Sequence, residues 1–167
     1  LLRYLRETKG VVGYGVEIDH ERVLGCIRND VDVIQIDIER GLSGFEDHSF
    51  DHVIISQALQ AMHATERILG EMLRVADEAV VSFPNFAYQT NRQAIASGHM
   101  PVSEDLPYEW YDTPNVRFFT IADFEALCDE LGIEVRERLA FDDAGRPVTD
   151  DPNLNGSLAF YRLARRA

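Results

Sequence analysis

Short apolar runs alternate with helical patterns along most of the chain. The apolar runs have the length and composition of strands buried on both faces of a sheet, and they cover residues 11–18, 31–36, 51–56 and 78–83. Apolar residues at helical spacing lie between and after them, in residues 19–28, 65–76 and 86–97. Strands that alternate with helices in this way predict a mostly parallel sheet.

The last third of the chain has a different pattern. Thr120, with Asp123 three positions later, predicts the start of a helix that Gly132 ends. Two strands follow at residues 133–141 and 157–163, joined by a Gly/Pro/Asp-rich turn without a helix, which is typical of an antiparallel pair. We therefore predict one domain over residues 1–167, a doubly wound α/β fold with helices on both sheet faces and a closing antiparallel pair.

Composition and charge narrow the range of partners. The net charge is −13 and the 16 Lys and Arg residues are scattered, which argues against nucleic acid and anionic membranes as partners. No apolar run approaches the roughly 20 residues of a membrane-spanning helix. Cys26 and Cys128 sit singly in helical patterns without neighbours at metal-ligand spacing, so we expect reduced core thiols, a cytoplasmic location and no metal site.

Carboxylates follow the first two strands, where ligands bind in doubly wound sheets. Glu17, followed by Ile18, can accept two hydrogen bonds from a ribose diol; alternatively it is an exposed strand-end residue or a second helix cap. Asp37 can accept from an adenine amino group while Ile38 packs on the ring, or it simply forms a turn. Gln57, after the third strand, is a further candidate cofactor contact or a backbone cap.

Polar and aromatic residues follow the fourth strand. Asn85 and Tyr88 come directly after it, and a long irregular segment at 98–119 adds Tyr108, Trp110 and Tyr111. These side chains predict either a lid over an acceptor substrate or a protein interface, where Tyr and Trp are enriched; a third interpretation is that they cover the sheet edge.

Catalytic residues are not evident from the sequence. His48 and His52 flank a turn and would not share a helical face, and a lone His63 is a candidate base or a structural residue. No Ser-His-Asp or Cys-His arrangement is present. Transfer reactions that need mainly in-line positioning of the acceptor can proceed without such a triad, so its absence does not argue against an enzyme.

Several motifs together resemble the methionine biosynthesis protein MetW family. The resemblance covers nearly the whole chain, and its most diagnostic part is the long loop MPVSEDLPYEWYDTPN. The other motifs are GYGVEID, SFDHVIISQALQAM, EMLRV, VSFPNF and TIADFEALCDELG. It implies a Rossmann-like class I methyltransferase fold, S-adenosylmethionine as the cofactor and a role in methionine biosynthesis together with homoserine O-acetyltransferase. We leave open whether the protein forms a homodimer.

One feature departs from that family pattern. Class I methyltransferases begin with a strand that ends in a Gly-rich turn, and this chain contains no GxGxG. In the family's strand order, 3-2-1-4-5-7-6, the six strands above would be strands 2 to 7. We therefore expect a further upstream strand with the Gly-rich turn, between the strands at 11–18 and 51–56.

Three functions fit these residues. The leading interpretation is an S-adenosylmethionine-binding, methyltransferase-like protein of methionine biosynthesis. The second is a non-catalytic partner or activator of homoserine O-acetyltransferase. The third, an NAD-dependent oxidoreductase, fits an acidic residue after a strand but not the closing antiparallel pair.

Overall fold

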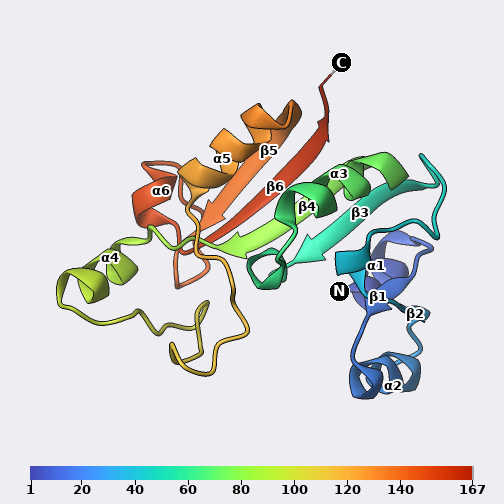
Figure 1. Ribbon diagram of the computed structural model, residues 1–167, viewed down its shortest axis with the longest axis horizontal. Coiled ribbons are helices and arrows are strands. Elements are labelled where there is room, and N and C mark those ends of the chain that lie inside the picture. Colours follow the sequence, from blue (N-terminus) through green and yellow to red (C-terminus); the bar gives the residue numbers. More distant parts are fainter. Residues whose placement is uncertain (167) are drawn as a thin grey trace. The chain divides into compact units, whose positions relative to one another are not determined.

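The chain folds into two compact units (Figure 1). The structure, a computed structural model, describes residues 1–166; the first unit is Leu1–Leu42 and the second is Ser43–Ala167. Each unit contains its own sheet, with strand orders β1-β2 and β3-β4-β6-β5.

Unit 1 is a small parallel β-α-β arrangement. Its elements are α1 (Leu2–Lys9), β1 (Gly15–Glu17), α2 (His20–Arg28), β2 (Val33–Gln35) and the 3-10 turn η1 (Ile38–Arg40). The predicted helix over residues 19–28 is confirmed as α2. Gly10 ends α1 in a left-handed conformation (φ 67°) and donates its N–H to Arg6 O, while the Asp19 side chain accepts from Arg22 N at the start of α2.

The first predicted strand is much shorter than expected. Residues 11–14 lie outside β1, and Val12 is 95% exposed, so the prediction of a strand over residues 11–18 buried on both faces is wrong in this unit. The reason is the ladder: β2 pairs only with Gly15–Glu17, in the register Gly15↔Val33 to Glu17↔Gln35. Without a partner strand, residues 11–14 have no ladder hydrogen bonds to hold them extended in a sheet.

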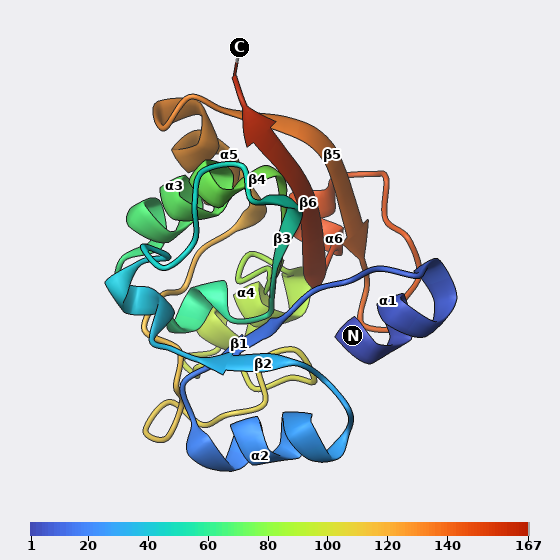
Figure 2. The same cartoon turned by 90° about the vertical axis from the view of Figure 1, so that its right-hand side faces the viewer.

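Unit 2 contains the four-stranded sheet. Its elements in chain order are β3 (Phe50–Ser56), η2 (Leu59–Ala61), α3 (Thr65–Val75), β4 (Ala76–Pro84), α4 (Gln89–Ala96), α5 (Ile121–Glu130), β5 (Ile133–Phe141), α6 (Pro152–Asn155) and β6 (Leu158–Arg165). β3 and β4 are parallel, whereas β6 runs antiparallel to both β4 and β5. The predicted parallel strands and closing antiparallel pair are confirmed, and α3 and α5 lie on the same face of this sheet (Figure 2).

The strand order agrees with the predicted numbering. β1 and β2 would be strands 2 and 3 of the family's sheet, and the order β3-β4-β6-β5 reproduces strands 4-5-7-6. β1 and β3 do not pair with each other. The upstream strand itself stays a prediction.

The core of unit 2 lies between its sheet and the two helices. Phe83 packs against Phe124 with ring centroids 4.7 Å apart and stacks on Tyr161 at 5.7 Å, and all three are essentially buried. The Tyr161 hydroxyl donates to Glu125 Oε1 at 2.8 Å, so the one polar atom of this aromatic cluster is satisfied. The predicted capping box of α5, Thr120 with Asp123, is present and sets where this helix begins.

The segment between the two closing strands contains a helix that the sequence did not predict. α6 is a single turn with Pro152 in its first turn, where a missing N–H costs nothing. Its position is set by distant partners, because the Asn85 side chain donates to Asn153 O at 3.0 Å.

Candidate functional site

Glu17 lies at the carboxyl end of β1 with its two oxygens in different surroundings. Oε1 accepts from the backbone N–H groups of Ile18 and Asp19 at 2.8 and 2.9 Å. Oε2 has a longer contact, 4.0 Å to a guanidinium nitrogen of the exposed Arg22. The backbone therefore holds the carboxylate in one orientation and leaves Oε2 able to accept from a ligand.

Asp37 repeats this arrangement after β2. Its Oδ1 accepts from Glu39 N at 3.0 Å and caps the η1 turn, while Oδ2 lies 3.4 Å from Arg40 Nε. The turn-forming role that the sequence left open is therefore real, and it occupies only one oxygen. Because Glu17 and Gln35 are register partners, both carboxylates lie at the same end of the parallel β1–β2 pair.

Apolar side chains adjoin both carboxylates. Ile18 is 60% exposed, and Ile38 is half-buried. Two fixed carboxylates beside exposed aliphatic surface can bind a group with both hydroxyl or amino donors and a flat apolar face. A nucleoside has these features.

Gln57, in unit 2, adopts a strained backbone conformation at the end of β3. Its φ is +49°, a left-handed value that costs a non-glycine residue about 1–2 kcal/mol. Its N–H donates to Ser82 O at 2.9 Å, and its carbonyl accepts from the buried Gln60 side chain. The Gln57 side chain is exposed, so the fixed backbone presents it to solvent.

Asn85 has a structural role in place of the expected substrate or interface contact. The residue is fully buried, and its Nδ2 donates to Asn153 O and Gly156 O at 3.0 and 2.8 Å. Its Oδ1 accepts from Ala87 N and Ile121 N. A side chain with no exposed surface and every polar atom bound to backbone cannot line an interface in this conformation.

Tyr88 is also buried, with 6% of its surface exposed. Burial raises the pKa of its hydroxyl, and a hydrogen bond to Asp143 acts in the same direction. Tyr88 therefore packs between the start of α4 and the β5–α6 turn, and in this conformation it is too buried to form part of a protein interface.

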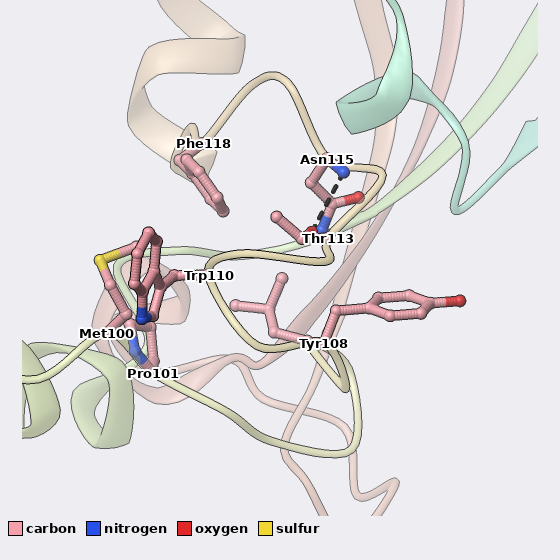
Figure 3. A pocket seen from close by; sticks show the side chains of 8 residues that line it. Met100, Pro101, Tyr108, Trp110, Thr113, Asn115 and Phe118 are labelled. Carbon is pink, nitrogen blue, oxygen red and sulfur yellow. Dashed lines mark hydrogen bonds between the residues drawn. The ribbon is translucent and has the colours of Figure 1, made fainter.

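The long loop presents its aromatic side chains to solvent. Tyr108, Trp110 and Tyr111 are 48%, 69% and 70% exposed. Figure 3 shows Trp110 beside Met100 and Pro101, with the Tyr108 ring pointing away from it. The cavity beneath these residues measures only about 10 Å³, at most enough for one water molecule. The cavity beside Trp110 therefore has no room for an acceptor substrate in this conformation, since ligand pockets measure about 300–1,000 Å³.

The histidines of unit 2 contact acidic or backbone groups. His48 Nδ1 lies 2.9 Å from Asp77 Oδ1, His52 Nε2 lies 3.4 Å from Glu78 Oε2, and the His63 carbonyl accepts from Arg117. Within residues 1–166, no three His, Cys, Asp or Glu side chains gather as a metal ion would require. In the same residues, no helix is long and apolar enough to span a bilayer.

Two features of unit 2 escaped sequence reasoning. Gln60 is buried, and its carbonyl accepts from Val116 N and Arg117 N, which ties the loop to the end of β3. A hollow of about 530 Å³ is lined by Glu104 and Asp105 from the loop and by Asp142 and Asp143 from the turn after β5. The adjacent acidic pairs Glu104-Asp105 and Asp142-Asp143 can be seen in the sequence. That the two pairs lie close together could be learned only from the fold.

Comparison with known proteins identifies the family. The sequence model described as "Methionine biosynthesis protein MetW" matches residues 1–163, almost the entire chain. The chain belongs to the MetW family. A curated relative from Rhodopirellula baltica, the "Bifunctional methionine biosynthesis protein MetXA/MetW", is 39% identical over 159 residues. The match covers 90% of the present chain and 26% of that relative, so this MetW chain spans about a quarter of the relative's length.

Solved structures agree with the fold expected for MetW. A possible histamine N-methyltransferase from Thermotoga maritima superposes with a TM-score of 0.68 at 17% identity, covering 98% of this chain and 76% of that one. An S-adenosylmethionine-dependent methyltransferase from Mesorhizobium loti gives 0.67 at 14% identity, covering 98% and 85%. At these identities the likeness concerns the fold alone, and the methyltransferase-like α/β fold is confirmed.

Proposed function

We propose that this MetW chain binds S-adenosylmethionine through the carboxyl ends of β1 and β2. The observation that carries the proposal is the pair Glu17 and Asp37, each with one oxygen fixed by a backbone N–H and the other turned toward an exposed arginine. Glu17 would accept from the ribose hydroxyls and Asp37 from the adenine amino group, with Ile18 and Ile38 as apolar contacts to the base.

The fixed oxygens support this assignment energetically. A carboxylate whose orientation is already set loses little conformational entropy when a ligand binds. A larger part of the free energy of each hydrogen bond therefore contributes to affinity. The exposed Ile18 adds apolar surface that a bound adenine would remove from water.

Calorimetric titration of the intact polypeptide with S-adenosylmethionine, S-adenosylhomocysteine and NAD tests the proposal. We expect both sulfur-containing nucleosides to bind and NAD to bind much more weakly or not at all. If NAD alone binds, the two carboxylates recognise a dinucleotide, and the proposal that S-adenosylmethionine is the cofactor is wrong.

A second candidate function is non-catalytic support of homoserine O-acetyltransferase, the enzyme to which the family resemblance links the chain. Two observations favour it: a relative carries MetXA and MetW in one polypeptide, and this chain exposes an aromatic pair beside a cavity of only about 10 Å³. Co-purification of the two proteins from one cell extract, followed by an acetyltransferase assay with and without this chain, tests it. If no complex forms and the acetyltransferase rate is unchanged, this chain does not support homoserine O-acetyltransferase.

A further inference from the structure

Trp110 and Tyr111 form an exposed aromatic pair on unit 2. Their rings meet edge to face with centroids 5.6 Å apart and an interplanar angle of 89°. About 70% of each residue is exposed to solvent, although these are the residue types that contribute most to protein interfaces. Met100, Val102 and Phe118 on the same loop are also exposed, by 42%, 52% and 46%, so the pair belongs to a larger apolar surface.

The loop that carries the pair is held in place on both sides of it. Val116 N and Arg117 N both donate to Gln60 O at 3.0 Å, and Phe86 N donates to Phe119 O at 3.1 Å. Leu106 is buried, and its N–H and carbonyl both bond to Ser103. Because these contacts already order the loop, a partner that binds the aromatic pair pays little additional conformational entropy.

An acidic hollow adjoins the aromatic surface. Asp105 lines the hollow and the next residue, Leu106, lines the small cavity beside Trp110, so the two features share one stretch of backbone. The rings of Phe141 and Phe160, 5.6 Å apart, line the hollow together with Asp142 and Asp143. Asp142 is paired with Arg146 at 2.7 Å, but within residues 1–166 no cation pairs with Glu104 or Asp105.

Charge complementarity identifies the kind of occupant. Carboxylates above an aromatic wall bind a guanidinium or ammonium group, which the acidic oxygens attract and the ring faces accept. A second copy of this chain is a poor occupant, because each copy carries a net charge of −13 and the two acidic surfaces would repel each other.

We propose that the loop surface around Trp110 and Tyr111 and the adjoining acidic hollow together form the docking site for homoserine O-acetyltransferase. The partner would place an arginine or lysine side chain in the hollow and apolar side chains against the aromatic pair. The inference rests on the second function proposed above, and it specifies which surface performs that function.

Binding measurements between the intact protein and purified homoserine O-acetyltransferase test the site with two pairs of variants. Trp110→Ala/Tyr111→Ala is compared with Tyr4→Ala, an equally exposed aromatic residue of unit 1. Glu104→Gln/Asp105→Asn is compared with Asp129→Asn/Glu130→Gln, an adjacent acidic pair on α5. Thermal unfolding checks that every variant is folded, and S-adenosylhomocysteine affinity is measured for each.

The aromatic double variant should bind at least about 30-fold more weakly, as expected when two central interface aromatics are lost. The acidic double variant should lose roughly three- to tenfold at low salt, and its affinity should depend less on salt than that of the wild type. Both controls should bind like the wild type.

Four other results would overturn the assignment, and they are distinguishable. If the wild-type protein does not bind the acetyltransferase, the proposed partnership itself falls. If it binds but both test variants bind equally well, the partnership stands and the docking site lies elsewhere. If the aromatic variant keeps the complex but loses affinity for S-adenosylhomocysteine, the loop is a lid; self-association of the wild type that the same variant abolishes would instead indicate a homodimer.

Discussion

Glu17 uses its two carboxylate oxygens differently, and substitutions can separate the two uses. Glu17→Ala should weaken S-adenosylhomocysteine binding by about 1.5–3 kcal/mol, the range for hydrogen bonds to a charged group, or roughly 10- to 150-fold. Glu17→Gln keeps an oxygen for the N–H groups of Ile18 and Asp19 but presents a charge-neutral amide to the ribose, so it should bind weakly while retaining the turn. Calorimetry measures both.

The nearby Glu21→Ala, on the first turn of α2, serves as the control for charge removal in unit 1. Equal affinity in wild type, Glu17→Ala and Glu17→Gln would show that Glu17 only forms the turn. In that case the cofactor site is not at the end of β1.

Asn85 joins three segments through a single buried amide. Asn85→Ala would leave the carbonyls of Asn153 and Gly156 and the N–H of Ile121 without their buried partner. We expect the free energy of unfolding to fall by about 2–4 kcal/mol, because each buried polar group left unsatisfied costs about 1–3 kcal/mol. Denaturant unfolding measures the loss, and the exposed Gln93→Ala on α4 should change stability by less than about 0.5 kcal/mol.

At the scale of elements, Glu78 links the four strands of unit 2. This β4 residue contacts Arg162 of β6 at 3.0 Å, Arg136 of β5 at 3.3 Å and His52 of β3 at 3.4 Å. Desolvation raises the pKa of Glu78, but the hydrogen bond and charge of Arg162, together with Arg136 and His52, outweigh it, and the pKa lies below its ordinary value.

This network predicts a dependence of stability on pH. A carboxyl group whose pKa is lower in the folded state stabilises the fold above its unfolded pKa of about 4.3, and that contribution disappears as the pH falls through the folded value. The stability advantage of wild type over Glu78→Gln should therefore be full at pH 6 and should shrink below about pH 4. Denaturant unfolding at several pH values measures it, with Glu130→Gln as a control; an advantage unchanged down to pH 2 would contradict the ion-pair explanation.

At the scale of the whole molecule, buried apolar side chains are distributed very unevenly. Within Leu1–Leu42, Val23 and Leu42 are the buried apolar residues, whereas unit 2 contains large, fully buried side chains such as Leu69, Phe83 and Tyr161. Burial of apolar surface is the main stabilising contribution, so local opening should cost less free energy in unit 1.

Hydrogen exchange should reveal this difference. Amides of β1 and β2 should exchange first and those of β4 and β6 last, because β4 and β6 each have ladder partners on both sides. Native-state exchange followed by NMR or mass spectrometry gives the order. Protection of β1 equal to that of β4 would mean that unit 1 has additional stabilising contacts, as a further strand beside β1 would provide.

The sequence by itself determined the elements whose signals are local. The start of α5 follows from Thr120 and Asp123, because a capping box acts within one helical turn. The strands β3 to β6 and their parallel or antiparallel pairing follow from periodicity and from the presence or absence of an intervening helix. Glu17 and Asp37 could be selected because the carboxyl ends of parallel strands share one edge.

Only the tertiary structure decided the features that join distant segments. Asn85 looked like a site residue, yet its partners lie up to 71 positions away and bury it completely. The same holds for α6, for the acidic hollow shared by residues 104–105 and 142–143, and for the shortened β1, whose length depends on its ladder partner. Burial and hydrogen bonding between segments are properties of the folded chain, and no local pattern of side chains contains them.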